Sequence, residues 1–348
     1  MATTQKKKKK TTGGIRLGVL IAAISAILLA VGCLIFCMKS ATPTDQPRWV
    51  RIPAGADRAA VADSLRSALG ITCGNRVYTI WRTMGGIPSR AHGAYRFDHS
   101  TSSAGAARRL KNGTQSPVKV TFNYARDLAD MASKVTRNVE IDSEEFLEAC
   151  DTLLPRHGFR RQQFPAAFMP DTYEAYWTDS GERLAERMLE ARNSFWDERR
   201  RQRAADLGMT PAEVATLASI VEEETAKADE RPTVARLYLN RLKRGMLLQA
   251  DPTVKFATGD PTLRRITRRH LAVQSPYNTY LHHGLPPGPI RIPDRRTIDA
   301  VLEAPLHNYI YMCAREDFSG YHNFAADYPT HQANARRYQK ELDRRGIR

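Results

Sequence analysis

Residues 210–225 read TPAEVATLASIVEEET and are the stretch that says most about the fold of this chain. Thr210 is followed by Pro211 and, three residues after the cap, by Glu213. This pattern predicts the start of a helix, because its side chains satisfy the free amides of a first turn. The apolar run that follows ends in three glutamates, residues 222–224. A helix that buries this run therefore presents carboxylates at its C-terminal end.

Helical spacing distinguishes the three glutamates. Leu217, Ile220 and Val221 lie seven, four and three residues before Glu224, so this carboxylate shares the apolar face. Burial raises the pKa of a carboxyl group, which makes Glu224 a candidate general acid. Glu222 has a thinner apolar covering and is the alternative acid. An acidic, solvated helix end without chemistry is the other interpretation of this pattern.

Three further segments surround this helix in the sequence. They are residues 170–177 (PDTYEAYW), 249–254 (QADPTV) and 277–290 (YNTYLHHGLPPGPI). Together with the glutamate helix, they resemble the MltG (YceG-like) family of membrane-bound endolytic murein transglycosylases. The resemblance runs from about Arg48 to the C-terminus and rests on the order and spacing of motifs that are individually weak.

The resemblance implies a lyase that cuts the MurNAc–GlcNAc bond within nascent peptidoglycan strands and so ends their elongation. One carboxylic acid protonates the leaving oxygen and then accepts the proton of the muramic acid C6 hydroxyl, which closes on C1. The product carries a 1,6-anhydro-MurNAc end, and no metal or organic cofactor is needed. Glu224 followed by Thr225 fits the Glu-Ser or Glu-Thr pair of lytic transglycosylases. Glu223 departs from the family, which usually has a lysine there.

The resemblance also implies a set of substrate-binding residues in two motifs. They are Gln249, Asp251, Thr253, Tyr277, Asn278, Thr279 and Tyr280. Their amide, hydroxyl and aromatic groups suit sugar hydroxyl and acetamido groups. Asp251 could instead cap a turn, and Tyr280 could belong to the core. Asp251 is also the second carboxylate that a glycoside hydrolase would need beside Glu224.

Other motifs are expected to support the site. The proline-rich residues 285–290 predict a rigid wall, where Gly288 permits a close approach. Asn240 and Arg241 are expected to hold the site together. His322 and His331 lack a familiar zinc spacing, so they are expected to make structural hydrogen bonds rather than bind a metal.

Composition and charge restrict the classes of partner. The chain has 348 residues, of which 42% are hydrophobic, and a formal net charge of +16. This size allows two domains, and the charge suits an anionic cell-wall polymer or membrane surface. No zinc-finger spacing, phosphate loop or helix-turn-helix signal supports nucleic-acid binding. Outside the apolar segment, the three cysteines Cys73, Cys150 and Cys313 are too few and too scattered for a disulfide framework and are expected to be buried apolar side chains. One bridged pair in an oxidising compartment is the alternative.

The N-terminal part predicts a single membrane anchor. Residues 1–16 form a basic tail, and residues 17–38 are an uncharged run of 22 residues, long enough to span a bilayer. Basic residues precede this run, so we expect a cytoplasmic N-terminus and an extracytoplasmic catalytic part at the bacterial inner (plasma) membrane. A cleaved secretory signal would have a shorter apolar core. Lipoprotein processing at Cys33 is disfavoured because apolar residues continue beyond it.

We expect an α+β fold with two domains after a linker at residues 39–47. Residues 48–125 resemble a LysM-like domain, with strands at 49–53, 93–97 and 118–122. This domain either binds glycan or only positions the catalytic part. Residues 126–348 predict a mainly helical catalytic domain with a long helix at 180–207, a turn at 170–173 and a C-terminal hairpin. Penicillin-binding proteins are the implied partners, and a non-catalytic peptidoglycan-binding scaffold is the rival function.

Overall fold

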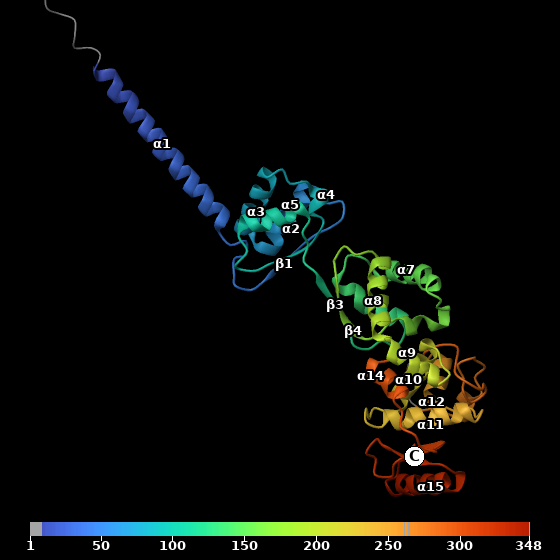
Figure 1. The fold of residues 1–348 in the computed structure, drawn as a ribbon. Helices are drawn as coiled ribbons and strands as arrows, with labels where there is room; N and C mark the ends of the chain where they lie inside the picture. Colours follow the sequence, from blue (N-terminus) through green and yellow to red (C-terminus); the bar gives the residue numbers. More distant parts are fainter. Residues whose placement is uncertain (1–8, 261, 264, 348) are drawn as a thin grey trace, which may run out of the picture. The chain divides into compact units, whose positions relative to one another are not determined.

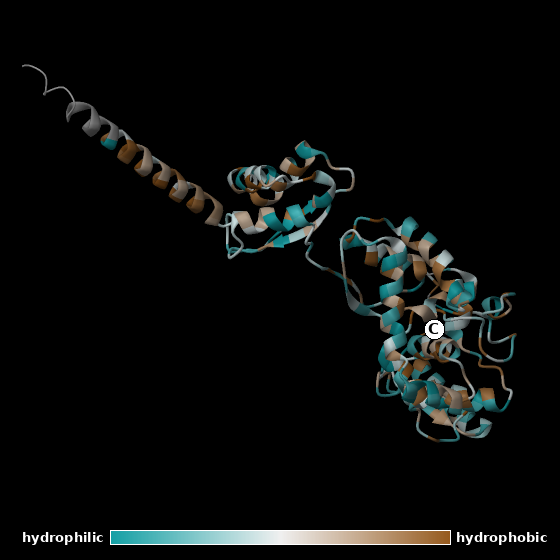
Figure 2. Ribbon diagram, turned by 45° about the horizontal axis from the view of Figure 1, so that its top comes forward, coloured by the Kyte–Doolittle hydropathy of each residue, from teal (hydrophilic) through white to brown (hydrophobic). Residues whose placement is uncertain are grey.

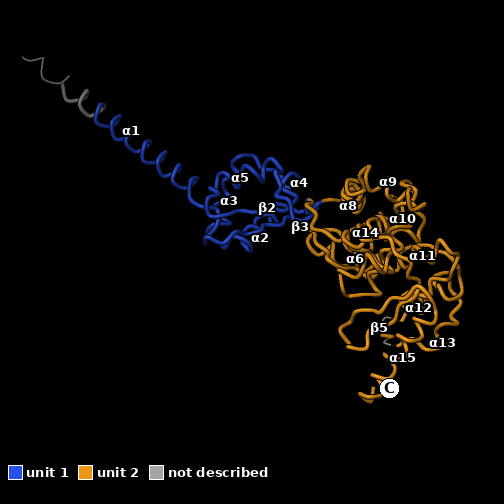
Figure 3. The backbone as a smooth tube through the Cα atoms, turned by 60° about the horizontal axis from the view of Figure 1, so that its bottom comes forward, with its two compact units in different colours: residues 1–118, 176–178 blue, residues 119–175, 179–348 orange. Residues whose placement is uncertain are grey.

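The structure is a computed structural model that describes residues 9–260, 262–263 and 265–347 (Figure 1). The chain divides into two compact units, residues 1–118 with 176–178 and residues 119–175 with 179–348 (Figure 3). Both units combine helices with small two-stranded sheets, in agreement with the predicted α+β class. The division falls before Lys119, earlier than the boundary expected after residue 125.

The N-terminal helix α1 (Lys9–Met38) contains the predicted anchor. Its apolar stretch Arg16–Met38 has 23 residues and is not buried inside the structure, and Figure 2 shows hydrophobic residues along it. At about 1.5 Å per residue this stretch matches the roughly 30 Å hydrocarbon core of a bilayer. Its length and composition therefore fit a single transmembrane anchor.

The predicted linker at residues 39–47 begins inside the fold of the first unit. The backbone N–H of Ser103 donates to the carbonyl oxygen of Lys39 at 2.8 Å, and the N–H of Ala41 donates to that of Thr101 at 2.8 Å. Ala41 is fully buried. These contacts attach the end of α1 to the first unit, so a free linker does not begin at residue 39.

The first unit places helices against a two-stranded sheet. Strand β1 pairs antiparallel with β2, with Trp49 opposite Arg96. The elements are β1 (Arg48–Ile52), α2 (Arg58–Leu69), α3 (Ile71–Thr83), α4 (Pro88–Ala91), β2 (Gly93–Phe97) and α5 (Ser103–Asn112). The sequence did not predict α3, whose Gly74 and Asn75 are poor helix formers. A Cβ on Gly74 would lie 2.7 Å from the α2 backbone, so this glycine permits close packing of the two helices.

Near the boundary between the units, the strand expected at residues 118–122 is confirmed and the turn expected at residues 170–173 is wrong. Strand β3 (Val118–Phe122) pairs with β4 (Asp171–Ala175) rather than with the β1–β2 sheet, and residues 170–173 are not a turn. Alternate residues of β3 are buried, and the Phe122 ring stacks on Tyr173 with centroids 6.3 Å apart. This pairing between distant segments leaves no local sequence signal.

The second unit is built around α10 (Pro211–Glu224). Residues 214–221 of this helix are all buried, as expected for a helix in the centre of a domain. The surrounding elements are α6 (Leu128–Val135), η1 (Thr136–Asn138), α7 (Ser143–Arg156), η2 (Arg161–Ala167), α8 (Gly181–Phe195), α9 (Glu198–Asp206), α11 (Arg231–Lys243), α12 (Asp251–Thr258), α13 (Arg268–Leu271), α14 (Arg295–Leu302), β5 (Tyr311–Ala314), β6 (His322–Ala325) and α15 (Tyr328–Arg344). The β5–β6 pair is the predicted C-terminal hairpin.

The predicted long helix at residues 180–207 is interrupted. Helix α8 ends at Phe195, and α9 begins after Asp197, whose side chain accepts from the backbone N–H of Arg200 at 2.8 Å. Trp196 between them is only 1% exposed. Burial of this large ring and the aspartate cap favour a break over a continuous helix.

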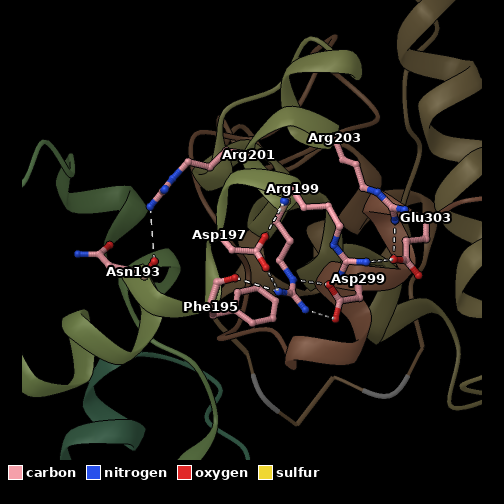
Figure 4. Close-up of polar contacts among 9 residues, drawn as sticks. Asn193, Phe195, Asp197, Arg199, Arg201, Arg203, Asp299 and Glu303 are labelled. Carbon is pink, nitrogen blue, oxygen red and sulfur yellow. Dashed lines mark hydrogen bonds and ion pairs between the residues drawn. The ribbon is translucent and has the colours of Figure 1, made fainter.

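Arginines of α9 contact the neighbouring helix α14. Arg200 donates to Asp299 at 2.8 Å. Arg203 donates to Glu303 at 2.5 Å (Figure 4). The Arg200 guanidinium also lies 4.1 Å from the centroid of the Phe195 ring. These contacts connect α9 to α14, which packs against α10. Arg200 and Arg203 therefore support α10 through α14.

Candidate active site

Glu224 is the last residue of α10 and lies partly buried in the second unit. The phenol of Tyr238 donates a hydrogen bond of 2.7 Å to its Oε1 atom. Burial raises the pKa of the Glu224 carboxyl from 4.5 to about 7. The Tyr238 hydrogen bond and the Arg241 charge lower this pKa, while the charges of Asp251 and Glu223 raise it. At neutral pH the protonated and deprotonated forms of the Glu224 carboxyl are therefore present in similar amounts.

Arg291 pairs with the two acidic neighbours of Glu224. Its guanidinium lies 3.0 Å from a carboxylate oxygen of Glu222 and 2.6 Å from one of Glu223. The other oxygen of Glu222 accepts from the backbone N–H of Asp294 at 2.8 Å. Within the described part of the chain, no ion pair reaches Glu224. Glu222, the alternative acid, is thus held as a paired carboxylate, and its side chain is only 7% exposed.

Glu224 opens into a cavity of about 740 Å³. Its lining consists of Glu223, Glu224, Asp251, Pro252, Lys255, Thr262, Leu263 and Ile266. Asp251 occupies the first position of α12, and its Oδ1 atom accepts from the Tyr280 phenol at 2.6 Å. The alternative in which Asp251 caps a turn is therefore not observed. Burial and the Asp251 carboxylate raise the Tyr280 pKa well above its ordinary value.

Three of the predicted substrate-binding residues are buried and bonded internally. The hydroxyls of Thr253 and Thr279 lie 2.8 Å apart, and Thr253 also donates to the carbonyl oxygen of Ala250 at 2.7 Å. Asn278 donates to the carbonyl oxygens of Leu271 and Val273, each at 2.9 Å. These side chains are at most 1% exposed. In this structure they position the segments that carry Asp251 and Tyr280, and their expected contact with sugar stays a prediction.

The remaining two predicted residues lie in different surroundings. Gln249 is exposed, and its backbone has φ +52°, a conformation that residues other than glycine rarely adopt. Tyr277 contacts the Phe256 ring with centroids 4.7 Å apart and lines a smaller cavity of about 200 Å³. Asp251 is thus the one predicted substrate-binding residue that lines the described Glu224 cavity.

The comparisons with known proteins agree with this architecture. A model of the YceG-like family matches residues 50–337. The chain belongs to the YceG-like family. A protein of Bacillus subtilis (strain 168) named endolytic murein transglycosylase is 24% identical over 293 residues, which cover 77% of this chain and 79% of that relative. A protein of the same name from Streptococcus pneumoniae serotype 2 is 33% identical over 110 residues, covering 30% of this chain and 20% of that relative.

A solved structure shows the same fold. The crystal structure of a YceG-like protein from Listeria monocytogenes matches with a TM-score of 0.54 and 22% identity, covering 83% of this chain and 99% of that one. These findings confirm the family that the motifs predicted.

Several supporting residues of this YceG-like chain act as the sequence predicted. Arg241 donates to the carbonyl oxygens of Ile310 and Leu248, each at 2.7 Å, and Asn240 donates to that of His307 at 2.7 Å. These bonds connect α11 with the segments before α12 and β5. Asn240 and Arg241 therefore hold the surroundings of the site together.

The proline-rich segment packs against α10 and η2. A Cβ on Gly288 would lie 1.8 Å from the carbonyl oxygen of Gln162, so only glycine allows this approach. The backbone N–H of Ile290 donates to the Ser219 hydroxyl at 3.0 Å. Pro289 lines the smaller cavity. The segment thus supports the helix that carries Glu224 and is not among the residues lining the larger cavity.

The two histidines contact different partners. The Nδ1 atom of His322 lies 2.8 Å from Oε2 of Glu230, whereas the His331 ring stacks on Tyr311 with centroids 5.1 Å apart. The expectation of structural bonding is confirmed for His322.

Sequence reasoning missed three residues that contact Glu224 or its neighbours in the chain, namely Tyr238, Arg291 and Glu230. Tyr238 lies on α11, and nothing in its sequence context indicated a hydrogen bond to a residue fourteen positions earlier. Arg291 follows the proline-rich motif, where a basic residue near an acidic cluster could have suggested a partner. Glu230 lies in the acidic stretch after Glu224 and gave no distinct signal.

Proposed function

We propose that this chain is a membrane-anchored endolytic lytic transglycosylase that cleaves peptidoglycan strands with Glu224 as its acid and base. The observation that carries this proposal is the raised pKa of a carboxyl group that opens into a large cavity. Membership of the YceG-like family, and the names of relatives from two bacteria, support the substrate class.

The first step is protonation of the glycosidic oxygen by Glu224. With a pKa of about 7, roughly half of the Glu224 carboxyls carry a proton at neutral pH. The proton passes to the leaving oxygen as the C1–O bond breaks, which leaves positive charge at C1. The Glu224 carboxylate then accepts the proton of the MurNAc C6 hydroxyl, and the C6 oxygen bonds to C1. The acid is restored, and the new end is a 1,6-anhydro ring.

Nearby groups stabilise the negative charge on the Glu224 carboxylate and the positive charge on the sugar. Tyr238 donates to the carboxylate after the first proton transfer. Asp251 is negatively charged and lines the same cavity, so it favours positive charge on the sugar in the transition state. The Tyr280 hydrogen bond holds the Asp251 side chain in place. A single residue with a pKa near 7 can therefore serve both proton transfers.

The anchor places this reaction at the membrane. The helix spans the bacterial inner membrane once, with a cytoplasmic N-terminus and an extracytoplasmic site. Nascent glycan strands are made at this surface, so penicillin-binding proteins are the proposed partners. The first unit is a LysM-like domain that follows the anchor in the chain. Its role is either to bind glycan or to position the second unit.

Mass spectrometry of digested peptidoglycan tests the proposal. The full chain in detergent is compared with Glu224→Gln and with Glu213→Gln, which changes an exposed carboxylate at the other end of α10 and retains its cap. We expect internal fragments with 1,6-anhydro-MurNAc ends from the wild type and Glu213→Gln, and none from Glu224→Gln.

Other products would support the rival functions. Reducing ends that contain an added water would indicate a glycoside hydrolase that uses Asp251 with Glu224. Strand binding by a folded protein without any cleavage, also on membrane-bound nascent strands, would indicate a scaffold.

A further inference from the structure

A buried hydrogen-bonded cluster includes Thr225, the residue that follows Glu224. Glu230, the residue before α11, is only 6% exposed. Its Oε2 atom accepts from the Thr225 hydroxyl at 3.0 Å and lies 2.8 Å from Nδ1 of His322. Its Oε1 atom accepts from the backbone N–H of His322 at 2.8 Å. One carboxylate thus connects the end of α10, the start of α11 and strand β6.

This arrangement restrains the last turn of the helix that carries Glu224. The final carbonyls of a helix lack partners within the helix, so such turns fray unless other groups hold them. Thr225 follows Glu224 directly, and its hydroxyl also accepts from the backbone N–H of Lys227 at 3.0 Å. A buried carboxylate needs its hydrogen bonds to remain satisfied, which makes the arrangement stiff.

We propose that Thr225, Glu230 and His322 are positioning residues that form a clamp behind Glu224 and hold its carboxyl in its partly buried orientation. This inference rests on the proposed function only for its effect on cleavage. Thr225, Glu230 and His322 are not among the residues that line the cavity, so they act through the backbone of residues 224–225. The same clamp sets the start of α11, which carries Tyr238 and Arg241.

The clamp determines the proton affinity of Glu224. The charged and titratable groups around this carboxyl include Tyr238 and Arg241 on α11, Asp251 and Lys255 on α12, Glu223 on α10 and Tyr280. If the last turn loosens, water reaches Glu224 and its pKa falls from about 7 toward 4.5. A fall of one unit reduces the protonated fraction at pH 7 from about one half to about one tenth, a roughly fivefold loss.

Three variants separate the clamp from a simple change of charge. Thr225→Val removes one hydroxyl and leaves every charge in place. Glu230→Gln removes the carboxylate of the clamp. Asp229→Asn is the matched control, because this neighbouring exposed carboxylate accepts from the Tyr321 phenol at 3.0 Å instead of from the clamp residues.

The measurement is a titration of the Glu224 carboxyl by ¹³C NMR in the full chain in detergent, with the signal identified by its loss in Glu224→Gln. We expect the midpoint of the Glu224 titration to fall by about one pH unit or more in Thr225→Val and Glu230→Gln. In Asp229→Asn the midpoint should stay unchanged. Cleavage at pH 7 should fall at least fivefold in the first two variants through kcat rather than KM.

Two results would overturn the clamp. One is an unchanged Glu224 midpoint in Thr225→Val. The other is an equal shift in Glu230→Gln and Asp229→Asn with none in Thr225→Val, which would mean charge acting through space. If Glu230→Gln does not fold, Thr225→Val decides the question alone. If the wild type does not cleave peptidoglycan, the proposed function fails, whereas the titration still tests the clamp.

Discussion

Replacement of the acid should stabilise the second unit in a pH-dependent way. Glu224 has a pKa of about 7 in the folded protein and 4.5 as its ordinary value. The folded state therefore binds this proton more tightly, and stability is lost as the pH rises from 4.5 through 7. A difference of about 2.5 units corresponds to about 3 kcal/mol at 1.36 kcal/mol per unit, an upper value for a partly exposed side chain.

Glu224→Gln should not lose this stability, because its amide does not titrate and can still accept from Tyr238. We expect the stability of the variant relative to the wild type to increase by up to about 3 kcal/mol between pH 4 and pH 8.5. Urea-dependent hydrogen exchange of the α10 and α11 amides measures the free energy of unfolding of this unit. A difference that stays constant across this pH range would refute the raised pKa of Glu224.

Three further changes test the surroundings of the site. Tyr238→Phe removes a hydrogen bond to the carboxylate, worth roughly 1.5–3 kcal/mol, so the Glu224 pKa should rise by about one to two units and the alkaline limb of the cleavage profile should move up equally. Arg291→Gln leaves Glu222 without its counter-charge and should cost about 3 kcal/mol in urea unfolding, much of which the added Glu222→Gln change should restore. Gly288→Ala forces a Cβ into the η2 backbone and should lower stability by roughly 1–3 kcal/mol in the same assay, with a larger loss of activity than of secondary structure.

Local patterns predicted the parts of the site that lie within one helix. The cap at Thr210 and the spacing of Leu217, Ile220 and Val221 were sufficient to place Glu224 at the apolar end of α10. The cap depends on residues three positions apart. The apolar spacing repeats with the helical period over the two turns before Glu224. For that reason the sequence alone could separate Glu224 from its neighbours.

Interactions between distant elements could not be predicted from the sequence in the same way. Strand β3 joins β4 across about fifty residues, and Arg291 pairs with glutamates almost seventy positions earlier. Neither contact leaves a periodic pattern, because each depends on how whole elements pack. The break between α8 and α9 was also missed, since the burial of Trp196 reflects the fold and not the local charge pattern.

The motifs mixed two kinds of residue that only the structure separates. In the segment QADPTV, Asp251 lines the cavity while Thr253 is fully buried against Thr279. A polar residue in a motif suits ligand contact and internal bonding equally well, and burial decides between them. The same reasoning applies to the three glutamates, because Arg291 pairs with two of them and leaves Glu224 to titrate near neutral pH. The chemistry of the site therefore depends as much on which carboxylates are neutralised as on which carboxylate faces the cavity.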